Sequence, residues 1–261
     1  MSIPVHSTLD RYLGALAELP ESVRPTGSPE GAVVVLDGAG RWWEDTLVAM
    51  GSGAVAVVVS RPRPAPADAV RRLTGAPVVL ERALLRPDLA ADVRTLPIGT
   101  PSALVVECHA PEPALAGALL DALGWVAVVA PGPQTLRSAD VARGRGVALL
   151  DAGGGTPVSL VVGSSAGAPA DGRVRLTALG ETLLELEAGG GEQWLTVTDA
   201  SSRRRSPARF ESPQRVALRR AIAAVDGGVI PADLADLAAE TAVAEAILRS
   251  RADARVAAST S

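Results

Sequence analysis

Short apolar runs alternate with amphipathic stretches over the first half of the chain. An amphipathic segment at residues 8–19 and a Pro/Gly-rich segment at 20–31 come first. Largely apolar runs of strand length follow at residues 32–36, 55–59, 77–80, 103–107 and 125–129. Stretches with helical spacing lie between them, at residues 41–50, 68–73, 84–94 and 112–123. The alternation predicts a mostly parallel sheet, covered on both faces, from residue 31 to about residue 130.

Past Pro131 the pattern changes to strands with no helices between them. Strand candidates occur at residues 147–150, 158–162, 173–179, 182–187 and 193–198, and several of these alternate polar and apolar positions. Such alternation is typical of an antiparallel sheet with one solvated face. Helices are predicted at residues 213–225, before Gly227 and Gly228, and at 231–249, where Pro231 suits a first turn.

These elements predict three parts. Residues 1–30 form an N-terminal helix and linker, residues 31–135 a degenerate Rossmann-like α/β domain, and residues 136–261 an antiparallel-sheet domain with closing helices. The fold class is therefore α/β, with a parallel Rossmann-like half followed by an open antiparallel sheet (α+β) and C-terminal helices.

The composition removes several kinds of chemistry. All 25 basic residues are arginine, so no lysine is available for a Schiff base or a phosphate-binding loop. A net charge of −4 argues against a nucleic-acid partner. Cys108 is the single cysteine, and the apolar runs are too short to span a membrane, so we expect a cytoplasmic protein without a membrane partner.

Asp37, Gly38 and Gly40 follow a buried strand and are the candidates for cofactor binding. Two glycines after a strand let backbone N–H groups approach a pyrophosphate at a helix N-terminus. The third glycine of a dinucleotide fingerprint is missing, two tryptophans follow, and the next strand ends without an acidic residue for the ribose. The residues themselves favour a plain turn.

Two further motifs contain reactive residue types but are not expected to form catalytic or metal-binding sites. The G-x-S-x-G pattern at residues 163–167 is followed by turn signals and has no histidine after it, so a hydrolase nucleophile is not expected. Glu107, Cys108 and His109 lie together at the end of a strand, where neighbouring side chains point to opposite faces. With two histidines and one cysteine in the whole chain, we predict no metal site.

The order of elements resembles a known family. Residues 157–160, the hairpin at 173–187, Phe210-Glu211-Ser212 with the helix after it, and the closing segment at 244–250 (AEAILRS) follow one another as in the Gfo/Idh/MocA family. This family comprises nicotinamide-dependent sugar and polyol dehydrogenases. The resemblance implies a Rossmann domain, an open antiparallel sheet that often forms an oligomer interface, and a helix near the C-terminus.

The same comparison locates departures from the family. Ser60-Arg61-Pro62 lies where the family has E-K-P with a catalytic lysine, so Arg61 occupies the lysine slot. An arginine does not exchange protons near neutral pH. On this alignment the glycine-rich first nucleotide unit is absent, and the D-x-x-x-H segment has no counterpart because no histidine follows His109. The catalytic residues are therefore unknown.

We accordingly expect a degenerate, N-terminally shortened family member without a cofactor, a pseudoenzyme acting as a binding or regulatory subunit. It would pair through the antiparallel sheet with itself or with an intact dehydrogenase. One alternative is an active NAD(P)-dependent oxidoreductase with Gly38 and Gly40 on the cofactor and Arg61 orienting an acidic substrate. Its proton donor would come from Asp37, Glu81, Glu107, Cys108 or His109. Another is a sensor that binds a sugar or sugar phosphate as a small-molecule ligand at the strand ends.

Overall fold

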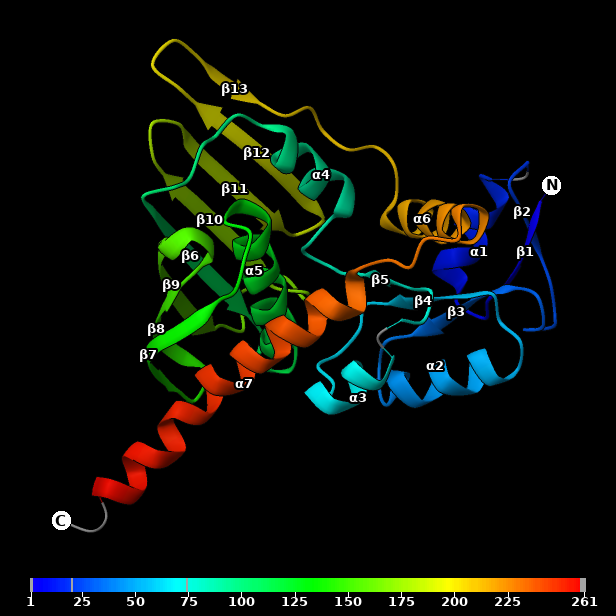
Figure 1. Ribbon diagram of the computed structural model, residues 1–261, viewed down its shortest axis with the longest axis horizontal. Helices are drawn as coiled ribbons and strands as arrows, with labels where there is room; N and C mark the ends of the chain where they lie inside the picture. The colour runs from blue at the N-terminus through cyan, green and yellow to red at the C-terminus, as the bar shows by residue number, and fades with distance from the viewer. Residues whose placement is uncertain (1, 20, 74, 259–261) are drawn as a thin grey trace. The chain divides into compact units, whose positions relative to one another are not determined.

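The computed structural model describes residues 2–19, 21–73 and 75–258, and the chain divides into two compact units (Figure 1). Unit 1 comprises Met1–Arg82 and Arg209–Ala239, and unit 2 comprises Ala83–Ala208 and Glu240–Ser261. These bounds differ from those expected at residues 30 and 135. The physical reason is that a helix late in the chain packs on the first sheet, so unit 1 is built from two separated segments.

Unit 1 contains a five-stranded sheet in the order β2-β1-β3-β4-β5, in which every pair is parallel. The strands are β1 (Ile3–His6), β2 (Val23–Pro25), β3 (Val33–Asp37), β4 (Ala56–Ser60) and β5 (Val78–Glu81). The helices are α1 (Asp10–Ala17), α2 (Trp42–Gly51), α3 (Ala67–Leu73) and α6 (Pro213–Gly227). The predicted α/β class with a Rossmann-like parallel sheet is confirmed.

Alternate strand residues of this sheet face two different sets of helices. Val33, Val35 and Val58 pack in one buried cluster with Ala217 and Leu218 of α6 and with residues of α1. The helix α2 packs on β3 and β4 and contacts α3. Because β3, β4 and β5 are buried on both faces over most of their length, they read as continuous apolar runs in the sequence, which is why these three were predicted correctly.

The first 30 residues contain more structure than the expected helix and linker. The strands β1 and β2 flank α1 and lie parallel to each other, so residues 3–25 form a strand–helix–strand unit. This corrects the inference that a first such unit is absent. Both strands escaped prediction because they have only four and three residues and contain proline. Pro25 is tolerated because β2 is an edge strand.

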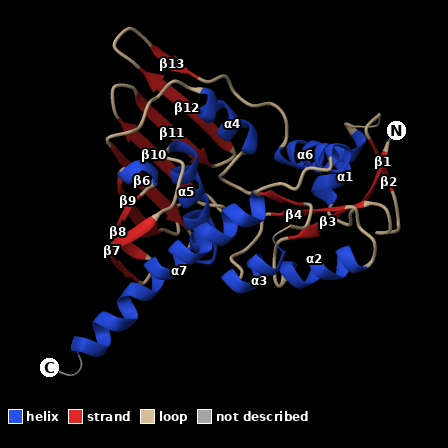
Figure 2. Cartoon of the chain, in the orientation of Figure 1, coloured by secondary structure: helices blue, strands red, loops and turns tan. Residues whose placement is uncertain are grey.

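Unit 2 contains an eight-stranded sheet in the order β13-β12-β11-β10-β6-β9-β8-β7 (Figure 2). Its strands are β6 (Ala103–Ala110), β7 (Thr135–Ala142), β8 (Arg145–Asp151), β9 (Pro157–Ser164), β10 (Arg173–Leu179), β11 (Leu183–Gly189), β12 (Glu192–Thr198) and β13 (Arg203–Arg205). Only β6 and β9 pair in parallel, and the other pairs are antiparallel. The helices α4 (Pro87–Thr95) and α5 (Leu115–Val129) belong to this unit, and α7 (Asp233–Ala258) begins in unit 1 and continues in unit 2.

Two elements expected in the parallel half are different in the structure. Residues 103–107 belong to β6, which lies inside the unit 2 sheet between β10 and β9. Residues 125–129 were expected to be a fifth parallel strand and are the last part of α5. This helix is buried nearly all round, and a short apolar run inside such a helix has no periodicity to distinguish it from a buried strand.

The helix α5 is the core helix of unit 2. It packs on β6, β9 and β10 and contacts α4. Among the described residues, the segment Glu112–Val129 is long and apolar enough to span a membrane, but 67% of it is buried inside the protein. Such burial is typical of a helix in the core of a protein.

One face of the unit 2 sheet is exposed. The side chains of Val105, Val147, Leu149 and Leu179 each keep between 39% and 48% of their surface exposed, whereas their strand neighbours Leu104, Val106, Ala148, Leu150 and Ala178 are buried. The alternation predicted from the sequence therefore corresponds to one buried and one open face.

Candidate functional site

The carboxyl ends of the unit 1 strands bring four polar residues to one edge. His6, Asp37, Ser60 and Glu81 end β1, β3, β4 and β5, which are all parallel. The chain places β2 on one side of β1 and β3 on the other, so the strand order reverses between β1 and β3. In open α/β sheets, ligands bind beyond the carboxyl ends at such a reversal. This edge is the candidate site.

The turn after β3 is packed against the turn after β4. The Gly38 N–H donates to the Ser60 carbonyl at 2.7 Å, and the Arg63 N–H donates to the Gly38 carbonyl at 2.9 Å. A Cβ on Gly38 would lie 2.5 Å from Cα of Pro62, so this glycine is required by the neighbouring backbone. Gly40 has φ +75° and open space around its Cα. Of the two candidate glycines, only Gly40 leaves room for a ligand.

Glu81 is the centre of a buried hydrogen-bond network. Only 4% of its surface is exposed. Its carboxylate accepts hydrogen bonds from the Tyr12 hydroxyl at 2.8 Å, from Nε2 of Gln214 at 2.9 Å and from the Ser60 hydroxyl. These donors satisfy a charge that is costly to bury alone. Burial, and then the Glu81 charge, raise the pKa of Tyr12 above its ordinary value, so Tyr12 stays a neutral donor.

Arg11, in the first turn of α1, reaches across two strands of this edge. Its Nε donates to the Ser60 hydroxyl at 3.0 Å, and its Nη2 lies 3.5 Å from Oδ1 of Asp37. The Arg11 and Asp37 side chains remain 36% and 53% exposed. The same Asp37 oxygen accepts the Ala39 N–H at 3.1 Å. Arg11 was not among the predicted site residues, and its position after β1 was a signal only once β1 had been recognised.

Arg61, which the sequence resemblance predicted to occupy the family's lysine slot, lies at the same edge. Its N–H donates to the Glu81 carbonyl at 2.8 Å, and its φ is +54°. A non-glycine residue in this region carries strain of about 1–2 kcal/mol. Such outliers persist where the surroundings hold them, and here Pro62 and the turn around Gly38 do so.

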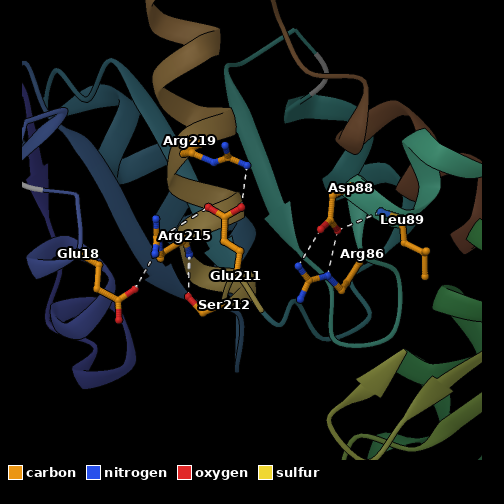
Figure 3. A network of polar contacts seen from close by, with 8 residues as sticks. All are labelled: Glu18, Arg86, Asp88, Leu89, Glu211, Ser212, Arg215 and Arg219. Atoms are coloured by element: carbon orange, nitrogen blue, oxygen red, sulfur yellow. Dashed lines mark hydrogen bonds and ion pairs between the residues drawn. The ribbon is translucent and has the colours of Figure 1, made fainter. Parts of the chain in front are cut away.

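The start of α6 is held by a second polar network, drawn in Figure 3. The Ser212 hydroxyl caps the helix by accepting the Arg215 N–H at 3.3 Å. Arg215 reaches Glu18, after α1, at 3.2 Å, and Arg219 donates to Glu211 at 2.8 Å. These contacts fix α6 against α1 and thereby place Gln214 on Glu81.

The other predicted proton donors lie on β6 in unit 2. Glu107 and His109 point to the open face of its sheet, and Cys108 is fully buried on the opposite face. Burial, and to a smaller extent the charge of Asp121, raise the pKa of Cys108 to about 12, so its thiol stays protonated. The His109 ring lies over Gly163, where a Cβ would approach Nδ1 to 2.4 Å. Cys108 and His109 therefore do not form a pair.

Asp121 and Trp125 lie one turn apart on α5, and both are buried. The Asp121 carboxylate accepts the Leu84 N–H at 2.8 Å, and Trp125 Nε1 donates to the Leu84 carbonyl at 2.8 Å. Both side chains hold the backbone that leads into α4. In the part of the chain that the structure describes, no group of three His, Cys, Asp or Glu side chains is arranged to hold a metal ion.

Solved structures of two enzymes have a similar fold. The UDP-N-acetylglucosamine 3-dehydrogenase GnnA from Acidithiobacillus ferrooxidans matches with a TM-score of 0.70 and 12% identity over 96% of this chain and 97% of that chain. The 3-ketoreductase KijD10 from Actinomadura kijaniata, in complex with NADP and TDP-benzene, matches with a TM-score of 0.63 and 14% identity over 96% and 97% of the chains. No family model and no curated protein sequence matches.

These matches confirm the predicted Gfo/Idh/MocA resemblance at the level of the fold. They also correct one expectation. We expected no cofactor, and the comparison contradicts this, because KijD10 structures of the same fold contain NADP. The inference failed because it treated the glycine-rich loop as the sole means of holding the dinucleotide, and because it missed the strand–helix–strand unit at residues 3–25.

Proposed function

We propose that this chain is an NAD(P)-dependent oxidoreductase whose substrate is a nucleotide-linked sugar or a related polyol. The observation that carries the proposal is the parallel unit 1 sheet with its reversal of strand order between β1 and β3. In doubly wound parallel sheets, nucleotide cofactors bind at the carboxyl ends of the strands where the strand order reverses. The sugar-nucleotide enzymes GnnA and KijD10 support the substrate class.

The residues at the carboxyl edge fit a dinucleotide by charge. Arg11 and Arg61 both lie there, and both are suited to phosphate groups because a guanidinium donates several hydrogen bonds in one plane. Gly40 leaves space beside the strand ends. When bound, the nicotinamide supplies the hydride acceptor or donor.

We assign to Asp37 the role of exchanging a proton with the sugar hydroxyl during the reaction. Of the five candidate donors, Asp37 and Glu81 lie at this edge, and Glu81 is buried with three donors on its carboxylate. Asp37 is half-exposed, so its carboxylate is available to a sugar hydroxyl. Arg61 holds an anionic part of the substrate or cofactor and transfers no proton.

Nucleotide titration and a turnover assay test this proposal. We expect saturable binding of NADPH or NADH, followed through nicotinamide fluorescence, and oxidation of UDP-N-acetylglucosamine or a TDP-linked sugar with NADP or NAD. The Asp37→Asn variant should retain nucleotide binding and lose turnover. If neither nucleotide binds, the proposal fails. Binding without turnover on any nucleotide sugar would instead support a regulatory subunit.

We also propose that a second copy of this chain covers the open face of the unit 2 sheet. The face exposes Val105, Val147, Leu149 and Leu179. Beside them lie oppositely charged side chains, among which Glu187 pairs with Arg173 and Arg175, and Glu185 with Arg203. A face with both apolar and mixed-charge groups is suited to a two-fold interface, in which each group meets its counterpart.

Light scattering on the purified chain tests the assembly. We expect a dimer that the Val147→Glu/Leu149→Glu variant converts to a monomer, while Val48→Glu on α2, an exposed apolar position of unit 1, leaves it unchanged. A monomeric wild type would contradict the second copy and leave the intact dehydrogenase as the expected partner. We also propose that the protein is located in the cytoplasm, as its single cysteine suggests.

A further inference from the structure

The Arg11–Asp37 ion pair lies where the strand order of the unit 1 sheet reverses. Arg11 starts from α1, which follows β1, and its guanidinium extends over β3 to β4, the strands on the far side of the reversal. Its position therefore coincides with the place where a dinucleotide phosphate is bound in sheets of this type.

The β1–α1 turn lacks the glycines that let a backbone approach a phosphate closely. Residues 6–9 include no glycine, and the Leu9 N–H donates to the Ser7 hydroxyl at 3.2 Å. Leu9 is the N-cap of α1, and no side chain caps this helix end, so N–H groups of the first turn can face a phosphate. The Arg11 side chain adds a cation beside them.

The Arg11 guanidinium has N–H groups that can still donate hydrogen bonds to a ligand. Its Nε is used by Ser60, and its Nη2 lies at 3.5 Å from Asp37, which is long for a hydrogen bond between charged groups. Across the described residues, no partner of Nη1 is found, and the side chain is 36% exposed. A phosphate oxygen can therefore approach from solvent while Ser60 keeps the side chain in place.

We propose that Arg11 binds the diphosphate of the dinucleotide and exchanges Asp37 for it. A diphosphate carries more negative charge than one carboxylate and presents several oxygens to the planar guanidinium. It therefore displaces Asp37 from the guanidinium. Asp37 keeps the Ala39 N–H after the exchange and is released from the ion pair at the moment the cofactor arrives. The inference rests on the proposed function and adds the phosphate-binding residue and its internal competitor.

The exchange predicts opposite effects of two substitutions. Arg11→Gln removes the cation and should weaken diphosphate binding at least about ten-fold, the size expected for a charge-assisted hydrogen bond. Asp37→Asn removes the competing charge, retains an oxygen for Ala39, and should strengthen binding by up to about five-fold, as for a half-exposed ion pair. A Gly40 or Gly38 contact to the phosphate would predict neither effect.

Isothermal titration calorimetry of the full chain with inorganic pyrophosphate, and separately with NADPH, tests the exchange. The variants are Arg11→Gln, Asp37→Asn and Arg71→Gln, the last a control that removes an exposed arginine of α3 in unit 1, which pairs with Asp68. We expect both probes to weaken with Arg11→Gln, to strengthen with Asp37→Asn and to stay within about two-fold with Arg71→Gln. Thermal melts check that each variant is folded.

The results separate this inference from the proposed function. NADPH binding that is unchanged in Arg11→Gln and in Asp37→Asn overturns the inference and leaves the oxidoreductase proposal standing. Arg11-dependent pyrophosphate binding without any NADPH binding contradicts the oxidoreductase and overturns the assignment of the diphosphate to a dinucleotide. If Arg11→Gln is unfolded, the Asp37→Asn result decides, because weaker or equal affinity for both probes overturns the exchange.

Discussion

The hydroxyl of Tyr12 donates a 2.8 Å hydrogen bond to the carboxylate of Glu81, across 69 residues of sequence. Tyr12 is fully buried and Glu81 nearly so. The bond joins α1 to the end of β5, and the same carboxylate accepts the hydroxyl of Ser60, which in turn accepts Arg11 Nε in the candidate site. The packing of the sheet edge and the geometry of the site are therefore coupled through one buried carboxylate.

Removing the Tyr12 hydroxyl should destabilise unit 1. The Tyr12→Phe variant leaves the Glu81 carboxylate with one donor fewer in a buried position, which costs about 1.5–3 kcal/mol in the free energy of unfolding. Urea denaturation measures the loss. In a Glu81→Gln background the same substitution should cost less, because the charge on the acceptor is gone; equal costs in both backgrounds would contradict the coupling.

Cys108 should be unreactive in the folded protein. With its pKa raised to about 12 from 9.0, and with no exposed surface, the thiol is neither ionised nor accessible at neutral pH. A thiol-specific reagent is expected to label it in urea and not in native buffer. Rapid labelling of the native chain would show that the thiol is accessible.

The same pKa gives the stability of the protein a dependence on alkaline pH. The unfolded chain releases the Cys108 proton near pH 9.0, and the folded chain retains it up to about pH 12. The contribution of Cys108 to stability is therefore full below pH 9.0 and decreases as the pH rises toward 12. Unfolding free energies measured across this range should fall more steeply for the wild type than for Cys108→Ala.

Gly38 and Gly40 should respond very differently to alanine. At Gly40 the new Cβ meets open space, so Gly40→Ala costs only the strain of a positive φ, about 1–2 kcal/mol. At Gly38 the Cβ collides with the Pro62 backbone, and Gly38→Ala should cost more than about 3 kcal/mol or prevent folding. Equal unfolding free energies for the two variants would show that the turn is not packed as described.

Mutation to glycine should separate the backbone strain at Arg61 from the role of its side chain in binding an anionic ligand. Replacing Arg61 by glycine relieves a positive φ and should stabilise the chain by up to about 1 kcal/mol, even though glycine costs entropy. Arg143, with φ +48°, is the matched control in unit 2. Both Arg61→Gly and Arg143→Gly should melt at or above the wild-type temperature, and only Arg61→Gly should weaken binding of an anionic ligand. A loss of binding in both variants would remove the special role of Arg61.

Much of the fold followed from the sequence where local pattern and burial agree. The strands β3 and β4 read as apolar runs because both faces are covered, and β10 alternates because one face is open. The pattern failed for β1 and β2, which are too short, and for the end of α5, where burial on all sides erases the helical period.

The candidate site was predicted only in part. Asp37, Gly38 and Arg61 were singled out because their residue types sit at strand ends, and the structure places all three at the edge of the unit 1 sheet. Arg11 and Tyr12 were missed because nothing in their own segment marks them. Their partners Ser60 and Glu81 are 49 and 69 residues away.

The sequence by itself determined the α/β class, the open face of the second sheet, and the absence of lysine, since these depend on local periodicity and residue content. Only the tertiary structure decided which strands share a sheet, that residues 3–25 form a strand–helix–strand unit, and that Arg11 faces Asp37. The physical reason is that pairing between distant strands is set by packing of the whole sheet, which no short stretch of residues encodes.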